Sequence, residues 1–413
     1  MEAHRIHLKS PARAAAVLAC AALGVGLTLA PVTAHAAGGR WGGGSCPAAE
    51  TLVSGTTWHT HKLAPGVTLS EGNRTDQNGR GLVKMHVLRI VVGKPGVSFH
   101  PLMHAVAQRT VLSKLAANHA SLVAAVNTGY FDFTTGAPTQ PLIVKGSPMV
   151  ISSRHQRVLG FDASGALQTG KVHLAATLFD GKQTRGVTGI NEVEGNGGLQ
   201  AYNPAWGGKA IPAGWQALAR SVVANKLGSS AGRNAHVPQG GYELMAQGTS
   251  ATHWLSGLSS GSKAGIAGKV RTTTKRPFVQ AYGVGAEVVK HFGKTRTNLS
   301  CDSANTDQPA RTAYGIADDG KILVIGEVED HPGTSVHGLD ENQMSGFMAQ
   351  LGVDRAFDVD GSGSTELLAK MPGTSTLKLR TYPADGEERA LPVGLGISYK
   401  APKVKKHHHK KKK

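Results

Sequence analysis

Short runs of β-branched and other apolar residues, separated by glycine and turn residues, recur along most of this 413-residue chain. Such alternating runs are typical of β-strands, and the turn residues between them mark where each strand ends. The sequence predicts strands over residues 85–92, 97–103, 122–126, 313–316, 322–325 and 355–359. The glycine-rich middle, about residues 150–300, is expected to be strand-rich as well, and the triplet Asp-Asp-Gly at 318–320 predicts a hairpin turn.

Two segments have the apolar spacing of helices. Residues 108–119 place several apolar side chains on one side, and residues 340–351 repeat Met, Phe, Met and Leu at helical intervals before Gly352, which is a typical helix stop. Together with the strands, these segments predict an α+β fold, with a mixed β-sheet, packed helices and a β-rich middle region.

The N-terminus has the three parts of a secretory signal peptide. Basic residues precede an apolar run from Ala14 to Ala30, and a small-x-small cleavage site follows at 34–36. A transmembrane anchor is the alternative, but it needs about 20 strongly apolar residues, and this run is shorter and rich in alanine and glycine. We therefore expect an exported protein without stable membrane insertion. The predicted organisation is a signal peptide over 1–36, a flexible leader over 37–57, one domain over 58–400 and a basic His/Lys tail over 401–413.

Two cysteines, Cys46 and Cys301, follow the predicted signal peptide. In an oxidising compartment such a pair is more often bridged than free, so we expect a disulfide between them. Two unpaired buried thiols are the alternative.

The chain is strongly basic, with a formal net charge of +18, and seven of its lysines lie in the tail. Outside a cell the abundant polyanions are wall polymers, acidic polysaccharides and lipid headgroups, so the charge predicts attraction to one of these. Nucleic acid is not the predicted partner, because only 5% of the residues are aromatic and no nucleic-acid-binding module is present.

The segment 356–365 (AFDVDGSGST) contains the strongest candidate site. Residues two apart share one face of a strand, so Asp358 and Asp360 are expected to project together while Phe357 and Val359 point into a core. Two close carboxyl groups resist joint ionisation, and they therefore share a proton, bind a cation or face a basic side chain.

The residues that follow this acidic pair could bind a ligand. Glycines let backbone N–H groups approach a ligand closely, and the hydroxyls of Ser364 and Thr365 add further donors. An ordinary turn made of Asp and Gly is one alternative. A calcium-binding loop is another, but its twelfth position would be Ala369, which offers no carboxylate.

Four motifs occur in a characteristic order and rough spacing, and the chain resembles the phosphodiester glycosidase family in them. They are NTGYF at 127–131, RTAYG at 311–315, the helical segment 338–352, and DGSGS at 360–364. The resemblance extends over about residues 58–400, through shorter matches at 66–67, 189–191, 199–207 and 282–285. The family usually has Gly at position 128, Asn at 358 and Gly at 362, where this chain has Thr128, Asp358 and Ser362.

This resemblance implies a phosphodiester glycosidase-like fold and a set of site residues. Arg311 would pair with a phosphate, and Asp360 would act as a base or position the sugar. Asn127 would hold a sugar hydroxyl or a phosphate oxygen, and Asp358 would tune Asp360 or bind a metal. The expected substrate-binding residues are Gly129, Gly361, Gly363, Ser364 and Thr365. No cofactor is expected, and a divalent cation remains an open alternative.

Three functions follow from these features. The favoured one is a secreted hydrolase that removes a sugar from a glycosyl phosphodiester in a cell-wall polymer or an extracellular glycan. The second is a non-catalytic basic protein that binds a polyanion or the cell wall, which the departures at 358 and 362 would favour. The third is a phosphodiesterase that cleaves P–O rather than C–O, and this would need a metal cluster that the sequence does not clearly supply.

Overall fold

The computed structural model describes residues 51–76, 79, 81–181, 183–193, 197–212, 217–231, 235–290, 293–295 and 308–402. The predicted signal peptide, both cysteines of the predicted disulfide, most of the leader and nearly all of the basic tail lie outside these residues. Within the described part of the chain, no helix is both long enough and apolar enough to cross a membrane.

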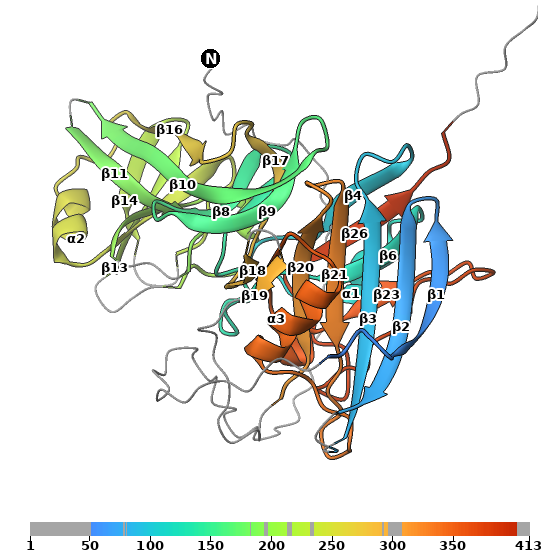
Figure 1. The fold of residues 1–413 in the computed structure, drawn as a ribbon. Helices are drawn as coiled ribbons and strands as arrows, with labels where there is room; N and C mark the ends of the chain where they lie inside the picture. Colours follow the sequence, from blue (N-terminus) through green and yellow to red (C-terminus); the bar gives the residue numbers. More distant parts are fainter. Residues whose placement is uncertain are drawn as a thin grey trace, which may run out of the picture. The chain divides into compact units, whose positions relative to one another are not determined.

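An eight-stranded antiparallel sheet carries the acidic motif (Figure 1). Its strands are, in spatial order, β1 (Thr57–Ala64), β2 (Val67–Thr75), β3 (Leu82–Val91), β21 (Ile322–Val328), β20 (Arg311–Ala317), β22 (Arg355–Asp358), β18 (Glu287–Lys290) and β19 (Lys294–Thr295). Strands β20 and β21 form the predicted hairpin. Its turn is tight, because Asp318, Asp319 and Gly320 all adopt positive φ angles.

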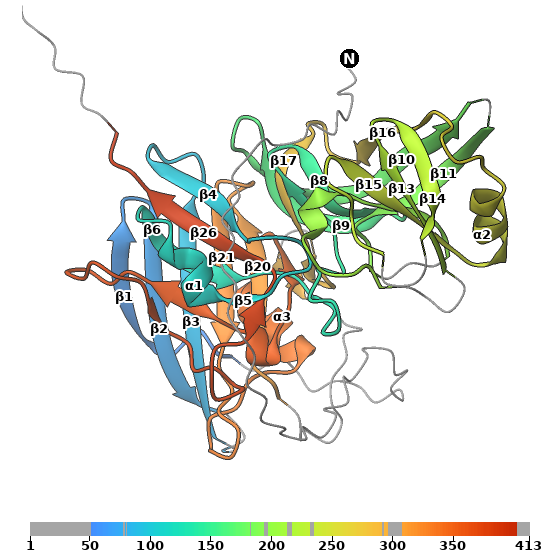
Figure 2. The same ribbon diagram turned by 180° about the vertical axis from the view of Figure 1, so that it is seen from behind.

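A five-stranded antiparallel sheet brings the Asn127 motif to the same region. Its order is β24 (Lys378–Leu379), β23 (Leu367–Ala369), β6 (Leu122–Asn127), β26 (Gly394–Tyr399) and β4 (Val97–Leu102). Every residue of the central strand β6 is buried, which explains its apolar sequence. Beside this sheet, β5 (Thr110–Val111) pairs with β25 (Ala390–Leu391). Figure 2 shows β6, β26 and β4 from the side on which helix α1 lies.

The predicted β-rich middle forms an eleven-stranded sheet. Its order is β14 (Lys226–Ala231), β13 (Ala217–Val223), β15 (Gly241–Gln247), β12 (Gly198–Tyr202), β11 (Gln183–Ile190), β8 (Ser147–Ser152), β7 (Leu142–Val144), β17 (Phe278–Gly283), β9 (Gln156–Asp162), β10 (Leu167–Asp180) and β16 (Ala264–Thr272). Its pairings are antiparallel except that of β11 with β12, which is parallel. Short 3₁₀ turns occur at η1 (Pro204–Trp206) and η3 (Ser362–Ser364).

The described residues contain three short α-helices: α1 (Leu112–Ala117), α2 (Thr249–Ser256) and α3 (Glu341–Gln350). Helix α3 contacts β18, β20 and β22 of the eight-stranded sheet and buries Met344, Phe347 and Met348 (Figure 1). Asp340 caps its first turn by accepting a hydrogen bond from the Gln343 backbone N–H at 2.7 Å. The predicted helix over 340–351 is therefore confirmed.

One hydrophobic core joins side chains from all three large sheets. It includes Val126 and Leu395 from the five-stranded sheet, Tyr314 and Phe357 from the eight-stranded sheet, and Tyr282 from the eleven-stranded sheet. The acidic motif leaves this core at the end of β22, so its position depends on packing from every sheet.

The predicted α+β class is wrong, because strands dominate the described residues and the helices are few and short. The prediction over 108–119 shows why it failed. Only residues 112–117 are helical, since Thr110 and Val111 instead pair with Leu391 and Ala390 as strands. Two β-branched residues at that point favour the extended form. The predicted strands over 85–92, 97–103, 122–126 and 355–359 are confirmed within one to three residues at their ends.

Candidate functional site

The two carboxyl groups of the acidic motif lie at the end of β22. Phe357 and Val359 point into the core, as the alternation predicts, so Asp358 projects to the other side of the strand. Both backbone groups of Asp358 are bonded to the segment that precedes β18, since its N–H donates to Ala286 O at 2.9 Å and its carbonyl accepts from Gly285 N–H at 2.8 Å. Asp358 is only 4% exposed, whereas Asp360 is partly exposed beyond the strand end.

Tyr130, in the loop after β6, and Arg311, at the start of β20, approach Asp358 from two other segments. The Tyr130 hydroxyl donates to Asp358 Oδ2 at 2.5 Å. Arg311 interacts electrostatically with Asp358, and its Nε donates to Leu339 O at 2.5 Å. Leu339 directly precedes the N-cap of α3, so the start of this helix holds the guanidinium beside the acidic pair.

Asn127 joins the strands beneath the site. It is 1% exposed, and its Nδ2 donates to Asp360 O at 2.7 Å. Its Oδ1 accepts from Thr312 Oγ1 at 3.0 Å and from Glu366 N–H at 3.3 Å. The amide is thus occupied by internal bonds that fix the backbone at Asp360, although 233 positions separate these two residues in the chain.

The turn after Asp360 is held by its own glycines and by Arg389. Gly361 N–H donates to Asp360 Oδ1 at 3.1 Å. A Cβ atom at Gly363 would lie 2.2 Å from both Arg389 Nη2 and Asp385 Oδ2, so a side chain at this position would displace the ion pair. Arg389 Nη1 also donates to Ser364 Oγ at 3.3 Å.

The other two predicted substrate-binding residues lie deeper. Thr365 is 1% exposed, and its hydroxyl bonds with that of Thr312. Gly129 packs against the backbone of Gly283, where a Cβ atom would lie 2.7 Å from the carbonyl oxygen. These two positions contribute backbone and packing rather than open surface.

Burial raises the pKa of Asp358 and of Asp360 to about 6 each. Arg311 and Tyr130 oppose this shift at Asp358 because they stabilise the charged form. Ser364 and Arg389 do the same at Asp360. Carboxyl groups that titrate near neutral pH can exchange protons with a bound reactant, which suits acid or base chemistry.

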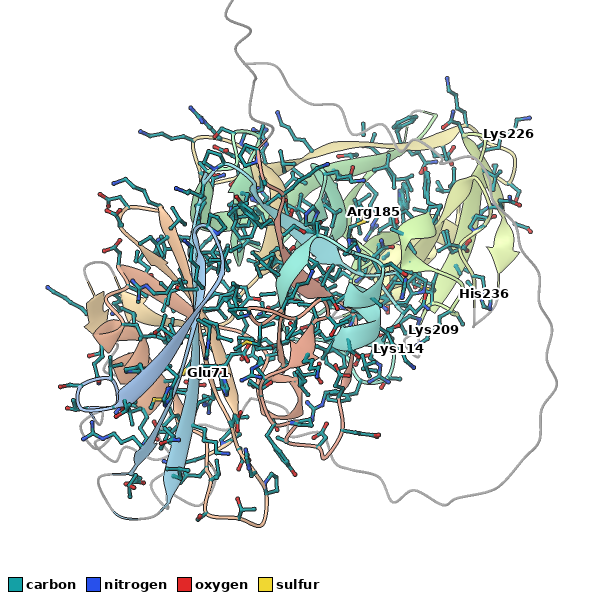
Figure 3. The ribbon with its side chains drawn as sticks, turned by 90° about the vertical axis from the view of Figure 1, so that its right-hand side faces the viewer. Glu71, Lys114, Arg185, Lys209, Lys226 and His236 are labelled. Atoms are coloured by element: carbon teal, nitrogen blue, oxygen red, sulfur yellow. The ribbon has the colours of Figure 1, made fainter. Side chains whose placement is uncertain are left out.

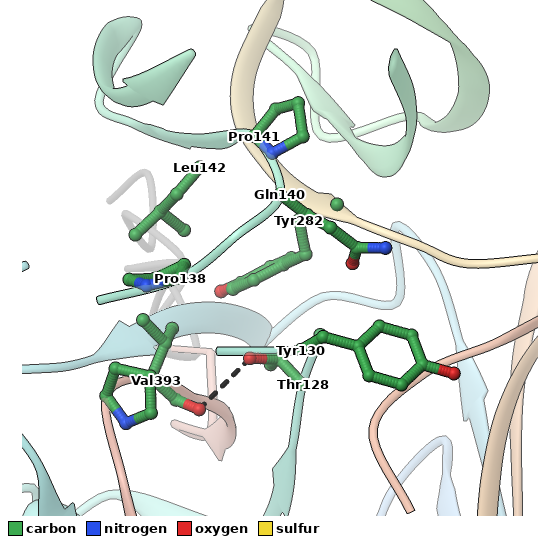
Figure 4. Close-up of a pocket in the computed structure, with 11 residues that line it drawn as sticks. Thr128, Tyr130, Pro138, Gln140, Pro141, Leu142, Tyr282 and Val393 are labelled. Atoms are coloured by element: carbon green, nitrogen blue, oxygen red, sulfur yellow. Dashed lines mark hydrogen bonds between the residues drawn. The ribbon is translucent and has the colours of Figure 1, made fainter. Parts of the chain in front are cut away.

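A small pocket adjoins the site on the side of Gly129 (Figure 4). Thr128, Pro138 and Tyr282 line it, and the Thr128 hydroxyl donates to Val393 O at 3.0 Å. Its cavity volume of about 10 Å³ has room for about one water molecule. Tyr130 also lines this pocket, and Figure 4 shows that its ring extends away from Pro138 and Leu142. Its hydroxyl bonds to Asp358, so the phenol connects the pocket wall to the acidic pair.

A second polar cluster crosses strands β2, β3 and β21. Although burial opposes its charging, hydrogen bonds to Glu329 and Glu71 raise the pKa of His86 to about 9. Glu329 also binds His331, and Glu71 forms a bidentate pair with Arg380. These groups neutralise one another, so we assign the cluster a role in linking strands.

Among the described residues, no group of three or more His, Cys, Asp or Glu side chains is arranged to hold a metal ion. The two acidic side chains of the site instead have separate partners, Tyr130 for Asp358 and Ser364 for Asp360.

Asn127, Arg311, Asp358 and Asp360 therefore meet in one region, as the sequence hypothesis required. Tyr130 and Arg389 belong to the same region, and sequence reasoning gave them no role. Tyr130 lies inside the recognised NTGYF motif, which was an available signal. Arg389 lies in a polar segment without any local pattern, so only the fold reveals it.

The phosphodiester glycosidase family model matches residues 214–398, which include Arg311, Asp358 and Asp360 but not Asn127. The resemblance expected from the motifs is thus confirmed over this segment. None of the curated proteins matches the chain.

Several solved structures are similar to the chain. A hypothetical protein from Synechocystis aligns with a TM-score of 0.68 and 18% identity over 84% of this chain, which spans 64% of that protein. A protein from Burkholderia pseudomallei K96243 that has been proposed to be exported aligns with a TM-score of 0.66 and 16% identity, over 87% of this chain and 100% of that one. These two likenesses show a shared fold.

The third is the catalytic domain of zebrafish N-acetylglucosamine-1-phosphodiester alpha-N-acetylglucosaminidase, auto-inhibited by its pro-peptide. It aligns with a TM-score of 0.45 and 16% identity, over 84% of this chain and 88% of that one. This likeness is too weak to support an argument.

Proposed function

Because residues 214–398 match the phosphodiester glycosidase family, we propose that this protein hydrolyses a glycosyl phosphodiester, releasing the sugar from the phosphate. The observation that carries the proposal is the meeting of one guanidinium with two carboxyl groups of raised pKa at the end of β22. A phosphodiester substrate offers an anion for the guanidinium and an anomeric carbon for a water molecule activated by a carboxylate.

In this proposal Arg311 binds the phosphate. Its Nε is already bonded to Leu339 O, so its orientation is fixed and its two Nη groups are the donors for a phosphate. A fixed cation is more effective than a mobile one, because no reorganisation is needed as negative charge develops on the leaving phosphate.

Asp360 is the proposed base. It is more exposed than Asp358, and bonds from Asn127 and Gly361 hold its loop in place. The ionised carboxylate would take a proton from water as the oxygen attacks the anomeric carbon. The C–O bond to the phosphate breaks as the new bond forms, through an oxocarbenium-like transition state, and its bonding electrons leave with the phosphate, which is a good leaving group and needs little acid assistance.

Asp358 and Asn127 are proposed to position these groups. Asp358 receives the Tyr130 hydroxyl and lies beside Arg311, so it fixes both the phenol and the guanidinium. Asn127 fixes the backbone of Asp360 through its side-chain amide.

We propose further that the protein is exported and that its substrate lies in a cell-wall polymer or an extracellular glycan. The N-terminal pattern at 1–36 and the basic composition support this location. The similar fold of the Burkholderia protein is consistent with it.

Turnover of an activated sugar-1-phosphate diester tests the reaction. In water enriched in heavy oxygen, C–O cleavage places the label in the sugar, whereas label in the phosphate would show P–O cleavage and contradict the proposal. If the wild-type protein binds the diester tightly without hydrolysing it, and Asp360→Asn binds it equally well, the result would instead establish the non-catalytic function.

A further inference from the structure

Three cationic side chains from distant parts of the chain surround the loop that follows the Asn127 motif. They are Arg109, Lys209 and Arg389. The loop itself is compact, because Asp132 Oδ1 accepts from the Thr135 N–H at 2.6 Å and from its hydroxyl at 2.7 Å. A single loop thus gathers charge contributed by residues 109, 209 and 389.

Phe133 at the centre of this loop is 52% exposed, which is unusual for a phenylalanine. Two guanidinium groups lie near its ring, with the Cζ of Arg109 at 5.9 Å and that of Arg389 at 5.4 Å from the ring centroid. Arg109 also lies 5.5 Å from the centroid of Phe131. Such contact with a ring can hold a guanidinium by its face, which leaves in-plane N–H donors for an anion. This applies to Arg109, because the Nε, Nη1 and Nη2 of Arg389 already donate to Asp385 and Ser364.

Lys209 extends the group along the surface. It is exposed, and its Nζ donates to Thr135 O at 3.0 Å; its position is labelled in Figure 3. Within the described part of the chain, neither Lys209 nor Arg109 forms a salt bridge, whereas Arg389 is paired with Asp385. The positive charges of Lys209 and Arg109 are therefore available to a ligand.

Arg389 connects this group to the proposed site. It donates to Ser364 Oγ and acts electrostatically on Asp360. Arg389 therefore contacts both Phe133 and the turn that follows Asp360, so the three cations lie next to the acidic pair. A substrate bound at Arg311 and Asp360 would be followed along the surface by Arg109 and Lys209.

We propose that Arg109, Phe133 and Lys209 form a second anion subsite, which binds a phosphate of the next repeat when the substrate is a polymer of sugar phosphates. This inference rests on the proposed function and specifies its substrate as a polyanionic chain rather than an isolated diester. The exposed ring of Phe133 would pack against the sugar between the two phosphates, while the cations bind the second phosphate.

The test compares kcat/KM for a single glycosyl phosphodiester with that for a synthetic oligomer of three or more phosphodiester-linked repeats. The wild-type protein should prefer the oligomer by about tenfold, as expected for two partly exposed charge contacts. In Arg109→Ala/Lys209→Ala the ratio of kcat/KM for the oligomer to that for the single diester should fall to about one. Arg109→Lys should retain part of the preference for the oligomer, because the positive charge remains.

A matched control exists on the eleven-stranded sheet. The Cζ of Arg185 lies 5.7 Å from the centroid of the Trp254 ring, and Lys226 is exposed (Figure 3). The double variant Arg185→Ala/Lys226→Ala therefore removes one ring-bound arginine and one exposed lysine at a different place on the protein. This control should retain the wild-type preference. An unchanged preference in Arg109→Ala/Lys209→Ala, or an equal loss with both substrates, would overturn the subsite.

Binding separates this inference from the hydrolase proposal. Tripolyphosphate is titrated into the wild-type protein and both double variants, with circular dichroism to confirm folding. Weaker binding in Arg109→Ala/Lys209→Ala alone supports the subsite even if no diester is hydrolysed, in which case only the hydrolase proposal fails. Equal binding in all three proteins would refute the subsite whatever the enzyme assay shows.

Discussion

At the scale of single residues, the chemistry assigned to Asp360 gives a defined pH dependence. A base acts only when it is ionised, and burial raises the pKa of this carboxyl to about 6. We therefore expect kcat/KM to rise with pH through about 6 and to level off above it. Asp360→Asn should lower kcat by about 10²- to 10⁴-fold and abolish that acidic limb. A variant that keeps both the rate and the limb would remove Asp360 from the mechanism.

Tyr130 offers a finer test of the same pair. Its hydroxyl bond favours the charged form of Asp358, so Tyr130→Phe should raise the pKa of that carboxyl further. In our proposal Asp358 positions Arg311, so the loss of the phenol acts on phosphate binding only indirectly. We therefore expect KM for the diester to rise by about three- to tenfold, which is less than the effect of a direct hydrogen bond to a charged group, about 1.5–3 kcal/mol. Steady-state kinetics across pH 5 to 8 would measure this. Tyr282→Phe, which alters another buried phenol, serves as the control.

A buried carboxyl in the eleven-stranded sheet predicts how stability varies with pH. Glu243 is 2% exposed, and burial raises its pKa from 4.5 to about 7. Between these values the folded protein binds more protons than the unfolded chain, so the free energy of unfolding decreases as the pH rises through this window. In Glu243→Gln, the free energy of unfolding should fall by about 1–3 kcal/mol less than in the wild type over the same pH range. Denaturant titrations at pH 5 and pH 8 measure it, with the exposed Glu387→Gln expected to behave like the wild type.

At the scale of elements, the start of α3 links helix capping to the site. Asp340 caps the helix, and the preceding Leu339 carbonyl holds Arg311. Asp340→Ala should lower the free energy of unfolding by about 1 kcal/mol and should also reduce turnover, because the helix start would shift. Asp340→Asn keeps an oxygen acceptor and should lose less of both. Equal losses in the two variants would show that the cap does not position the guanidinium.

The elements also show what could be predicted from the sequence. The β20–β21 hairpin and α3 depend on local patterns, such as the turn at 318–320 and the apolar spacing before Gly352, and both were predicted. The pairing of Asp358 with Tyr130, and of Arg389 with Ser364, depends on contacts between remote segments, which a local pattern cannot encode. The helix expected over 108–119 failed for the same reason, since a distant strand pairs with Thr110 and Val111.

At the scale of the whole molecule, the excess positive charge should govern association with polyanions. Deleting residues 401–413 removes seven lysines. We expect this deletion to weaken binding to an anionic wall polymer by about tenfold at low ionic strength, and much less near 1 M salt, where the Debye length falls to about 3 Å. Turnover of a small diester should be unchanged. Sedimentation with purified polymer at two salt concentrations measures the effect, and an affinity independent of salt would contradict it.

The placement of β6 also affects how the chain reaches this fold. This buried apolar strand lies between β23 and β26, which follow it by more than 230 positions, so both of its edges stay open while the intervening chain is made. An apolar strand with open edges is a template for pairing between molecules. Refolding yield should therefore fall steeply with protein concentration, and a chaperone that shields residues 122–127 until the C-terminal strands arrive would restore it.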